Sequence, residues 1–394
     1  MPLSVKCPEH QVLLRSMGLE TGPGAASALQ APLAQVTDWY ALLKFALGQG
    51  VFPSFYRRVA EVCPEAVPPE VLGEMQRLYR VNARRNLRLT GELLKLLAFL
   101  ESHGIPALPF KGPVLAQMAY GDVALRWFGD LDILVRREDV LGVKDLLAGA
   151  GYRPHPSLTP AQELAHLRRN HEFSFIHPEL TMLDVHWRFA DFPGGELDAD
   201  AAWGGSLPVP LAGKLVPSLA PEDMLLLLCQ HGTFHLWMSL GILNDVARLV
   251  QAREPWDWQG LLQRAGNMGL RRRLLLGLSL ARELLAAPVP EEVQRQVDKD
   301  PAISALSRLV RERLFADRAE SGLRERIQRN LFHVKVRERL RDRLTYARIR
   351  ALYPTKEDWN WISLPDRRYW LYYAVRPLRM AAQGLLLPLW RRVM

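Results

Sequence analysis

The chain has 394 residues, of which 48% are hydrophobic and 24% charged, and its formal net charge at pH 7 is +9. This composition is that of a globular protein of two or three domains, and it excludes a disordered chain. Three cysteines are too few and too scattered for a disulfide framework or a cysteine zinc site. No stretch reaches the roughly 20 apolar residues of a membrane-spanning helix, and no secretory signal is evident, so we expect a cytoplasmic protein.

The positive charge belongs to the C-terminal third of the chain. Residues 271–394 contain 27 Lys and Arg against 14 Asp and Glu, a net charge of +13, whereas residues 1–270 have a net charge of −4. Such a segment can bind an anionic membrane, a nucleic acid or an acidic partner. Solvated helix faces rich in Arg and Glu explain the same excess, so both interpretations stay open.

The N-terminal part is predicted to be helical after a mobile leader. Residues 1–32 show no sustained apolar periodicity and are assigned to the leader. Apolar residues then recur at three- and four-residue steps over 33–48 and again over 69–103, which predicts two helices. We therefore expect an N-terminal helical part over 33–103.

Short strands and helices alternate over residues 104–215. The pattern predicts two helices, over 114–120 and 139–150, and four strands, over 107–110, 128–135, 173–177 and 181–189. The turn residues Pro178 and Glu179 lie between the last two strands, which are expected to pair antiparallel. This order of elements predicts an α+β (mixed α/β) domain.

Helical patterns return after the sheet domain. We expect a helical domain over 216–350 and a basic, aromatic, amphipathic tail over 351–394. Within the tail, residues 369–394 combine Trp, Tyr and Leu with Arg, which suits the surface of a membrane or an acidic partner. Peripheral association with the inner membrane is therefore one interpretation. The other is a terminal helix packed on its own domain, because Pro377 and Pro388 interrupt the apolar stripe.

Three aspartates lie on strands that are expected to be buried. Asp130 and Asp132 are two residues apart, so their side chains share one face of the strand over 128–135. Asp184 is likewise a carboxylate within a strand that is expected to be buried, the one over 181–189, and it lies on the same face as His186. Unpaired carboxylates are costly in a buried strand, and Mg²⁺ favours oxygen ligands of this kind.

Several segments, in a fixed order, carry a family resemblance. They are Phe110-Lys111-Gly112-Pro113-Val114-Leu115, Tyr120-Gly121, Arg126, Asp130-Leu131-Asp132-Ile133-Leu134-Val135 and Leu183-Asp184-Val185-His186-Trp187. Together they resemble the uncharacterised bacterial nucleotidyltransferase family of the DNA polymerase β superfamily. The resemblance covers about residues 35–250.

The resemblance implies a fold, a reaction and a set of site residues. The fold is a mixed sheet flanked by N-terminal helices and a helical C-terminal domain. The reaction is a Mg²⁺- or Mn²⁺-dependent transfer of a nucleoside monophosphate from an NTP such as ATP to a hydroxyl-bearing acceptor, with release of pyrophosphate. The implied catalytic and metal-binding residues are Asp130, Asp132 and Asp184. The implied nucleotide-binding residues are Lys111, Gly112, Arg126 and His186.

One position departs from the superfamily pattern. Better-known members have Gly-Ser where the first strand turns into a helix, and this chain has Lys111-Gly112-Pro113. The lysine can replace the phosphate contact of the serine hydroxyl as a point charge. The same departure is also compatible with a substrate other than a triphosphate or with lost activity.

The acceptor is not specified by the sequence. We expect a small molecule or a protein side chain, because the catalytic part is slightly acidic. An RNA acceptor held by the Arg-rich C-terminal region is the alternative within the same reaction class. A different class is a catalytically silent scaffold that binds a partner or membrane through the basic C-terminal region.

Overall fold

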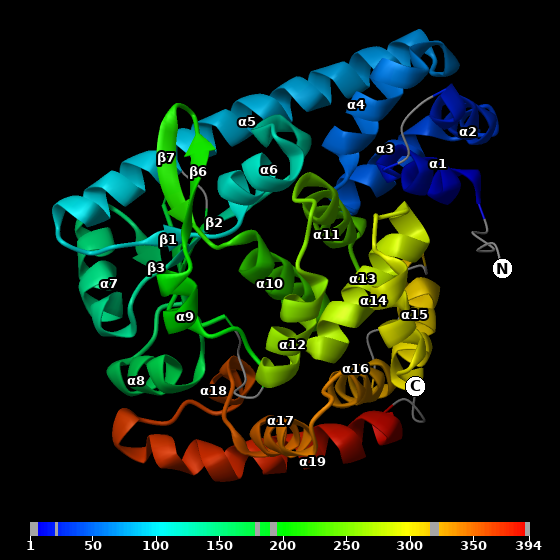
Figure 1. Ribbon diagram of the computed structural model, residues 1–394. Coiled ribbons are helices and arrows are strands. Elements are labelled where there is room, and N and C mark those ends of the chain that lie inside the picture. Colours follow the sequence, from blue (N-terminus) through cyan, green and yellow to red (C-terminus); the bar gives the residue numbers. More distant parts are fainter. Residues whose placement is uncertain (1–6, 20–22, 178–181, 190–194, 316–322, 391–394) are drawn as a thin grey trace.

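The computed structural model describes residues 7–19, 23–177, 182–189, 195–315 and 323–390 (Figure 1). Side chains are described over the same ranges except residues 23–27, 323–324 and 383–390. The α-helices are α1 Pro8–Met17, α2 Pro23–Leu33, α3 Trp39–Gly48, α4 Phe52–Val62, α5 Pro69–Ser102, α6 Gly112–Tyr120, α7 Val140–Gly149, α8 Pro160–Arg169, α9 Ala199–Gly204, α10 Pro221–Phe234, α11 Leu240–Ala252, α12 Trp258–Met268, α13 Arg271–Leu285, α14 Glu291–Asp298, α15 Pro301–Leu314, α16 Leu323–Lys335, α17 Leu340–Leu352, α18 Lys356–Trp361 and α19 Tyr372–Trp390. The strands are β1 Leu108–Pro109, β2 Asp130–Leu134, β3 Arg153–Pro154, β4 Glu172–Ile176, β5 Met182–His186, β6 Leu207–Leu211 and β7 Lys214–Ser218.

A five-stranded mixed sheet forms the centre of the middle domain. Its strand order is β1-β2-β5-β4-β3, with β2 and β5 parallel and the other neighbours antiparallel. The chain is therefore an α+β protein, as predicted. Strands β1, β2, β4 and β5 lie close to their predicted positions, and β4 and β5 pair antiparallel as expected, whereas β3, β6 and β7 were not predicted. Residues 178–181 between them lie outside the described part of the chain.

The sheet has its own apolar core, supplied by α5, α6 and α7. Leu131, Ile133 and Val185 alternate with the polar residues of β2 and β5 and are at most 3% exposed. They contact buried leucines and valines of the three helices. The alternation explains why these short segments form strands, since one face packs while the other faces a cleft.

The N-terminal and C-terminal helices share a second core, which the predicted domain division did not anticipate. Leu42 and Phe55 belong to the same buried cluster as Leu243 and Leu274. Backbone contacts join the two regions, since the Gln49 carbonyl accepts hydrogen bonds from the Gly241 amide at 2.9 Å and the Ser239 hydroxyl at 2.9 Å. Residues 33–103 and 216–350 thus do not fold around separate cores.

Residues 1–32 were predicted to be a mobile leader, but where the structure describes them they contain helix α1 and most of helix α2. Helix α1 buries Val12, Leu13 and Met17 completely in the shared core. A ten-residue helix has little stability of its own, so packing rather than local propensity explains why it forms. The helix expected from residue 33 begins instead at Trp39, because the Asp38 carboxylate accepts a hydrogen bond from the Ala41 amide at 2.8 Å and caps it.

Helix α5 is the long element of the fold and matches its prediction over 69–103. Its 34 residues span about 51 Å at 1.5 Å per residue. In Figure 1 it runs from the sheet to the N-terminal helices. Within the described part of the chain, no helix is both long and apolar enough to cross a membrane.

A buried ion pair joins the sheet domain to the helical domain. Arg126 precedes β2, and its Nε and Nη2 donate to the two carboxylate oxygens of Asp245 on α11 at 2.8 and 2.9 Å. The Tyr120 hydroxyl, at the end of α6, donates to the same carboxylate at 2.8 Å. The two side chains of the ion pair are 14% and 5% exposed. This bidentate pair fixes the entry into β2 against the helical domain.

We predict that Asp245→Ala destabilises the fold. Removing the carboxylate leaves the Arg126 cation buried without its partner, which costs about 3 kcal/mol of unfolding free energy. Tyr120→Phe removes one hydrogen bond and is expected to cost about 1 kcal/mol. Denaturant unfolding of both variants measures the effect, and an Asp245→Ala variant as stable as the unmodified chain would contradict it.

Candidate active site

Two of the predicted aspartates are aligned on neighbouring parallel strands. Asp132 of β2 lies directly opposite Asp184 of β5 in the register, and their exposed fractions are 3% and 8%. Asp130 lies two residues before Asp132 on the same face of β2 and is less buried. The structure thus places all three predicted carboxylates on one face of the sheet, although their oxygens do not all lie within 4.8 Å of one another.

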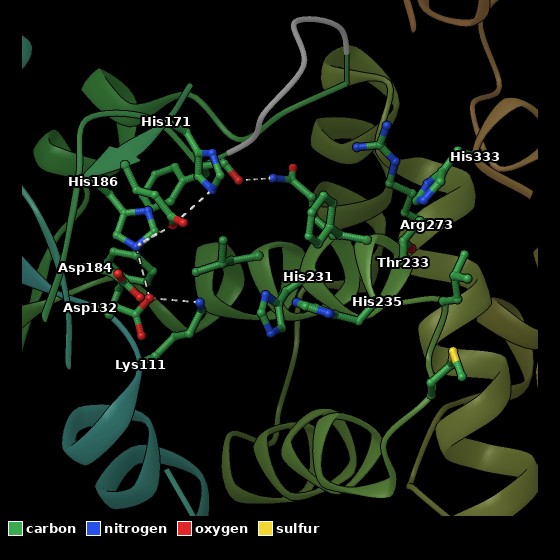
Figure 2. Close-up of a pocket in the computed structure, with 18 of the residues that line it drawn as sticks. Lys111, Asp132, His171, Asp184, His186, His231, Thr233, His235, Arg273 and His333 are labelled. Carbon is green, nitrogen blue, oxygen red and sulfur yellow. Dashed lines mark hydrogen bonds and ion pairs between the residues drawn. The ribbon is translucent and has the colours of Figure 1, made fainter. Parts of the chain in front are cut away.

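Two basic side chains contact the Asp132 carboxylate. Its Oδ1 lies 3.0 Å from Lys111 Nζ and 3.0 Å from His186 Nε2 (Figure 2). Burial alone raises the pKa of Asp132, but Lys111 and His186 outweigh burial and hold this pKa well below its ordinary value. The Asp132 carboxylate is therefore ionised at neutral pH. Lys111 and His186, which are predicted to bind the nucleotide, thus contact the Asp132 carboxylate, and their contact with a nucleotide stays a prediction.

The other two aspartates hold their protons more tightly. Burial, followed by the negative charges of Glu172 and Asp132, raises the pKa of Asp184 to about 6. Burial and the Asp132 charge also raise the pKa of Asp130. Carboxylates that repel one another in this way gain from a cation placed between them.

A histidine and glutamate group adjoins the aspartates and was missed from the sequence. One ligand atom from each of His171, Glu172 and His186 lies within 4.8 Å of the others, and the described residues contain no second such group of three. Glu172 of β4 lies opposite His186 of β5 in the antiparallel register. Burial raises the pKa of Glu172, but His171 and His186 lower it more, to about 2.

Gly112 brings the chain close to the sheet at the start of α6. Its φ is +52°, in the left-handed region, and an added Cβ would lie 3.4 Å from the Asp130 carbonyl oxygen. A side chain there would be strained, so glycine is favoured at this position. The N-terminus of α6 thereby points into the site region next to Lys111, which is the residue before the helix.

Most of the Arg126 guanidinium group is engaged in the ion pair with Asp245. Two of its nitrogens hold Asp245, and Nη1 is buried without a partner among the described residues. Its predicted phosphate contact stays a prediction.

The aspartates form one end of a cleft of about 610 Å³. The sheet contributes Lys111, Asp130, Asp132, Glu172, Asp184 and His186. Helix α10 and the turn after it contribute a middle wall that includes His231, Thr233, Phe234 and His235. The C-terminal helices contribute Arg273, Arg329, His333, Arg337, Tyr346 and Arg350. Figure 2 shows His231 and His235 between the aspartates and the far wall.

The donor set at the sheet end fits a hard divalent cation. Asp132 Oδ2 and Asp184 Oδ1 are buried and have no hydrogen-bond partner in the described part of the chain. A buried ionised oxygen without a partner is costly, and an ion bound by oxygen ligands would remove that cost. Asp130 supplies a third carboxylate at the same end.

The family of the chain follows from comparison with known proteins. A model of the family described as "Uncharacterised nucleotidyltransferase" matches residues 35–286, more than half of the chain. The chain belongs to this uncharacterised nucleotidyltransferase family. It is thus a nucleotidyltransferase, an enzyme that transfers nucleotidyl groups. No curated protein matches the chain.

Two solved structures of the antibiotic-resistance factor ANT(2'')-Ia show a weak likeness to this nucleotidyltransferase. The solution structure is 14% identical over 58% of this chain and 94% of that chain, with a TM-score of 0.28. The crystal structure with adenylyl-2''-tobramycin is 14% identical over 57% of this chain and 98% of that chain, also with a TM-score of 0.28.

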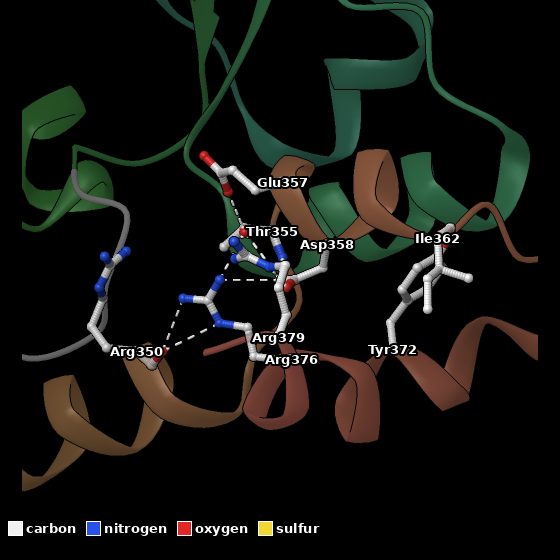
Figure 3. Close-up of polar contacts among 8 residues, drawn as sticks. All are labelled: Arg350, Thr355, Glu357, Asp358, Ile362, Tyr372, Arg376 and Arg379. Carbon is white, nitrogen blue, oxygen red and sulfur yellow. Dashed lines mark hydrogen bonds and ion pairs between the residues drawn. The ribbon is translucent and has the colours of Figure 1, made fainter. Parts of the chain in front are cut away.

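The far wall of the cleft is built largely from residues beyond the part that matches the nucleotidyltransferase family. A buried carboxylate, Asp358 of α18, organises this wall (Figure 3). It accepts hydrogen bonds from Arg376 Nη1 at 3.1 Å and from Arg379 Nε at 2.5 Å, both from α19. Arg376 also donates to the Arg350 carbonyl oxygen at 3.0 Å, which ties α19 to the end of α17.

These contacts bear on the predicted tail over 351–394. Arg376 and Arg379 are 4% and 6% exposed, so they pair inside the protein rather than forming a polar outer face. The described beginning of α19 therefore packs on its own domain, which is one of the two interpretations of residues 369–394. The side chains from residue 383 onward lie outside those the structure describes.

We predict that Asp358→Asn loosens the C-terminal helices. The substitution leaves two buried guanidinium groups without a countercharge, so we expect a loss of about 3 kcal/mol. Hydrogen exchange should accelerate over residues 350–382, while the sheet domain stays protected. Glu357→Gln, at the exposed neighbouring residue, should stay within about 0.5 kcal/mol. Equal exchange in the two variants would contradict the role of Asp358.

Proposed function

We propose that this nucleotidyltransferase transfers a nucleoside monophosphate from an NTP to a hydroxyl-bearing acceptor, with Mg²⁺ or Mn²⁺ as cofactor and pyrophosphate as product. The observation that carries the proposal is the alignment of Asp132 and Asp184 on parallel strands, each with a buried, unpartnered carboxylate oxygen. Buried carboxylates need a compensating cation, and phosphates bring Mg²⁺ to such sites.

The proposal assigns the metal to Asp130, Asp132 and Asp184. When bound there, a divalent cation lowers the pKa of an attacking hydroxyl and offsets charge at the transferred phosphorus. Lys111 and Gly112 face the phosphates at the N-terminus of α6, where backbone amides favour anions. His186 orients Asp132 through their 3.0 Å contact, and its direct contact with the nucleotide, like that of Arg126, stays a prediction.

The transfer step needs a group that accepts the hydroxyl proton. The acceptor oxygen forms a bond to the α-phosphorus, and the bond from that phosphorus to the bridging oxygen breaks. Pyrophosphate then leaves with the bonding electron pair. Asp184 takes the proton through the carboxylate oxygen that does not hold the ion.

The shape of the cleft favours a small acceptor over an RNA strand. Its volume of about 610 Å³ lies in the range of small-molecule sites. C-terminal helices form the far wall of the cleft. Figure 2 shows Arg273 on this wall, on the side away from Asp132.

We predict that the enzyme binds an NTP only in the presence of the divalent ion. Calorimetric titration with ATP, GTP, CTP and UTP, with and without Mg²⁺, measures this binding. Asp130→Asn with Asp132→Asn should weaken it at least 100-fold, because two of the three proposed ligands of the ion lose their charge.

A control variant distinguishes the loss of the proposed metal ligands from the loss of any two negative charges. Asp198→Asn with Asp200→Asn changes an acidic pair of the same spacing at the start of α9, where Asp198 caps the helix and Asn can replace it as a cap, and the variant should bind like the unmodified enzyme because neither residue lines the cleft. Nucleotide binding that is independent of Mg²⁺ and survives the Asp130 and Asp132 changes would contradict the proposal. No binding of any NTP would favour the scaffold alternative.

A further inference from the structure

The two ends of the cleft are lined by side chains of opposite charge. All the acidic residues that line it, Asp130, Asp132, Glu172 and Asp184, belong to the sheet end. The opposite wall carries four arginines, Arg273, Arg329, Arg337 and Arg350, and no acidic residue. Figure 2 places Arg273 and His333 on the side away from Asp132, with His231 and His235 between.

Two of these arginines are buried with donors that have no partner. Arg273 is 4% exposed, and its Nη1 donates to the Gly195 carbonyl, while Nε and Nη2 have no partner among the described residues. Arg337 is 6% exposed, and its Nη1 donates to the His333 carbonyl at 2.6 Å, while Nε has no partner within the same ranges. Buried cations with unmade hydrogen bonds are costly unless an anion joins them.

Among the carboxylates near this wall, Glu325 pairs with the wall residue Arg329 at 3.4 Å, and Asp342 keeps one buried oxygen, Oδ2, without a hydrogen-bond partner among the described residues. Glu196 pairs with Arg188 at 2.7 Å, Glu338 accepts from the Arg272 amide at 2.7 Å, and Asp342 pairs with Arg341 at 3.3 Å. None of the three lines the cleft. The arginine wall therefore keeps an excess of positive charge toward the cavity.

The pKa values of the buried basic side chains in this wall are lowered. Burial and then the Arg337 charge lower the pKa of Arg273 to about 9, and burial lowers the pKa of Arg337 to about 10. Burial and the neighbouring arginines lower the pKa of His333 to about 3, so its ring is neutral at pH 7. A bound anion would reverse each of these shifts, because it favours the charged form of every neighbour.

We propose that Arg273, Arg329, Arg337 and Arg350 form a subsite for a phosphate group carried by the acceptor, so that the substrate class is a small phosphorylated molecule with a free hydroxyl. This inference rests on the proposed function, which places the NTP at the carboxylate end. The transferred phosphorus must lie beside Asp132 and Asp184, and the arginine wall lies beyond the middle wall of the same cleft. Guanidinium groups bind phosphate oxygens in pairs, which suits a dianion better than a carboxylate.

The position of the subsite explains what the C-terminal helices add to the family fold. Arg329, Arg337 and Arg350 follow residue 286, where the family match ends. The contacts of Arg376 with Asp358 and the Arg350 carbonyl set this wall in place. Figure 3 shows the Arg350 side chain directed away from these contacts.

The test measures binding of inorganic phosphate by calorimetry in metal-free buffer of constant ionic strength. Phosphate should bind the unmodified enzyme, and Arg337→Gln should weaken this binding about tenfold or more. Because Arg337 is buried, a second variant, Arg329→Gln with Arg350→Gln, changes the two less buried arginines and should show the same loss. Arg348→Gln is the control, since Arg348 lies on α17 but lines only a neighbouring cavity.

A second readout separates this subsite from the NTP site. Binding of a non-hydrolysable NTP analogue with Mg²⁺ should stay within threefold in the arginine variants. Phosphate binding should in turn survive Asp130→Asn with Asp132→Asn, which tests the proposed function alone. The proposal is overturned if phosphate does not bind, if Arg348→Gln weakens it equally, or if NTP affinity falls with phosphate affinity. Acetate bound as tightly as phosphate, or an RNA oligonucleotide whose binding phosphate does not displace, would also overturn it.

Discussion

The parallel pairing of β2 with β5 is the constraint on which the site depends. It places Asp132 opposite Asp184 on a buried face, so two like charges share one low-dielectric environment. Lys111 and His186 contact Asp132 directly, whereas burial and the acidic neighbours of Asp184 raise its pKa to about 6. The unpartnered oxygens on both aspartates are the physical reason to expect a cation at this end of the cleft.

The rest of the chain closes the cleft around that pair. The Arg126 and Asp245 ion pair holds the entry of β2 against the helical domain, and the core shared by N- and C-terminal helices makes that domain a single body. The C-terminal helices then supply a wall of opposite charge. These helices lie largely beyond residue 286, where the family match ends, and add a second set of side chains to the cleft.

Local patterns predicted the sheet end well. Alternation in β2 predicted the shared face of Asp130 and Asp132, and alternation in β5 predicted the shared face of Asp184 and His186, but the pairing of β2 with β5 was not predicted. Glu172 was also predictable, because a hairpin centred on the turn that the sequence predicts at Pro178 and Glu179 would put Glu172 opposite His186, as the register of β4 and β5 does. The hairpin was predicted without its register, so this contact was missed.

Other features have no local signal in the sequence. Arg126 and Asp245 are 119 residues apart, and only the packing of α11 brings them together. The excess of arginine after residue 270 was evident from composition, but its convergence on one wall depends on how α13, α16 and α17 pack. Helix α1 was assigned to a leader because its stability comes from the core it enters rather than from its own ten residues.

The central claim is that the catalytic ion binds to the aspartates through oxygen ligands. Electron paramagnetic resonance of Mn²⁺ bound with a non-hydrolysable NTP analogue tests it directly, because nitrogen ligands leave a coupling in the pulsed spectrum. The account predicts a bound ion without nitrogen coupling, lost in Asp132→Asn. An ion coupled to nitrogen, and retained in Asp132→Asn but lost in His171→Ala, would instead place the metal at His171, Glu172 and His186 and contradict the account.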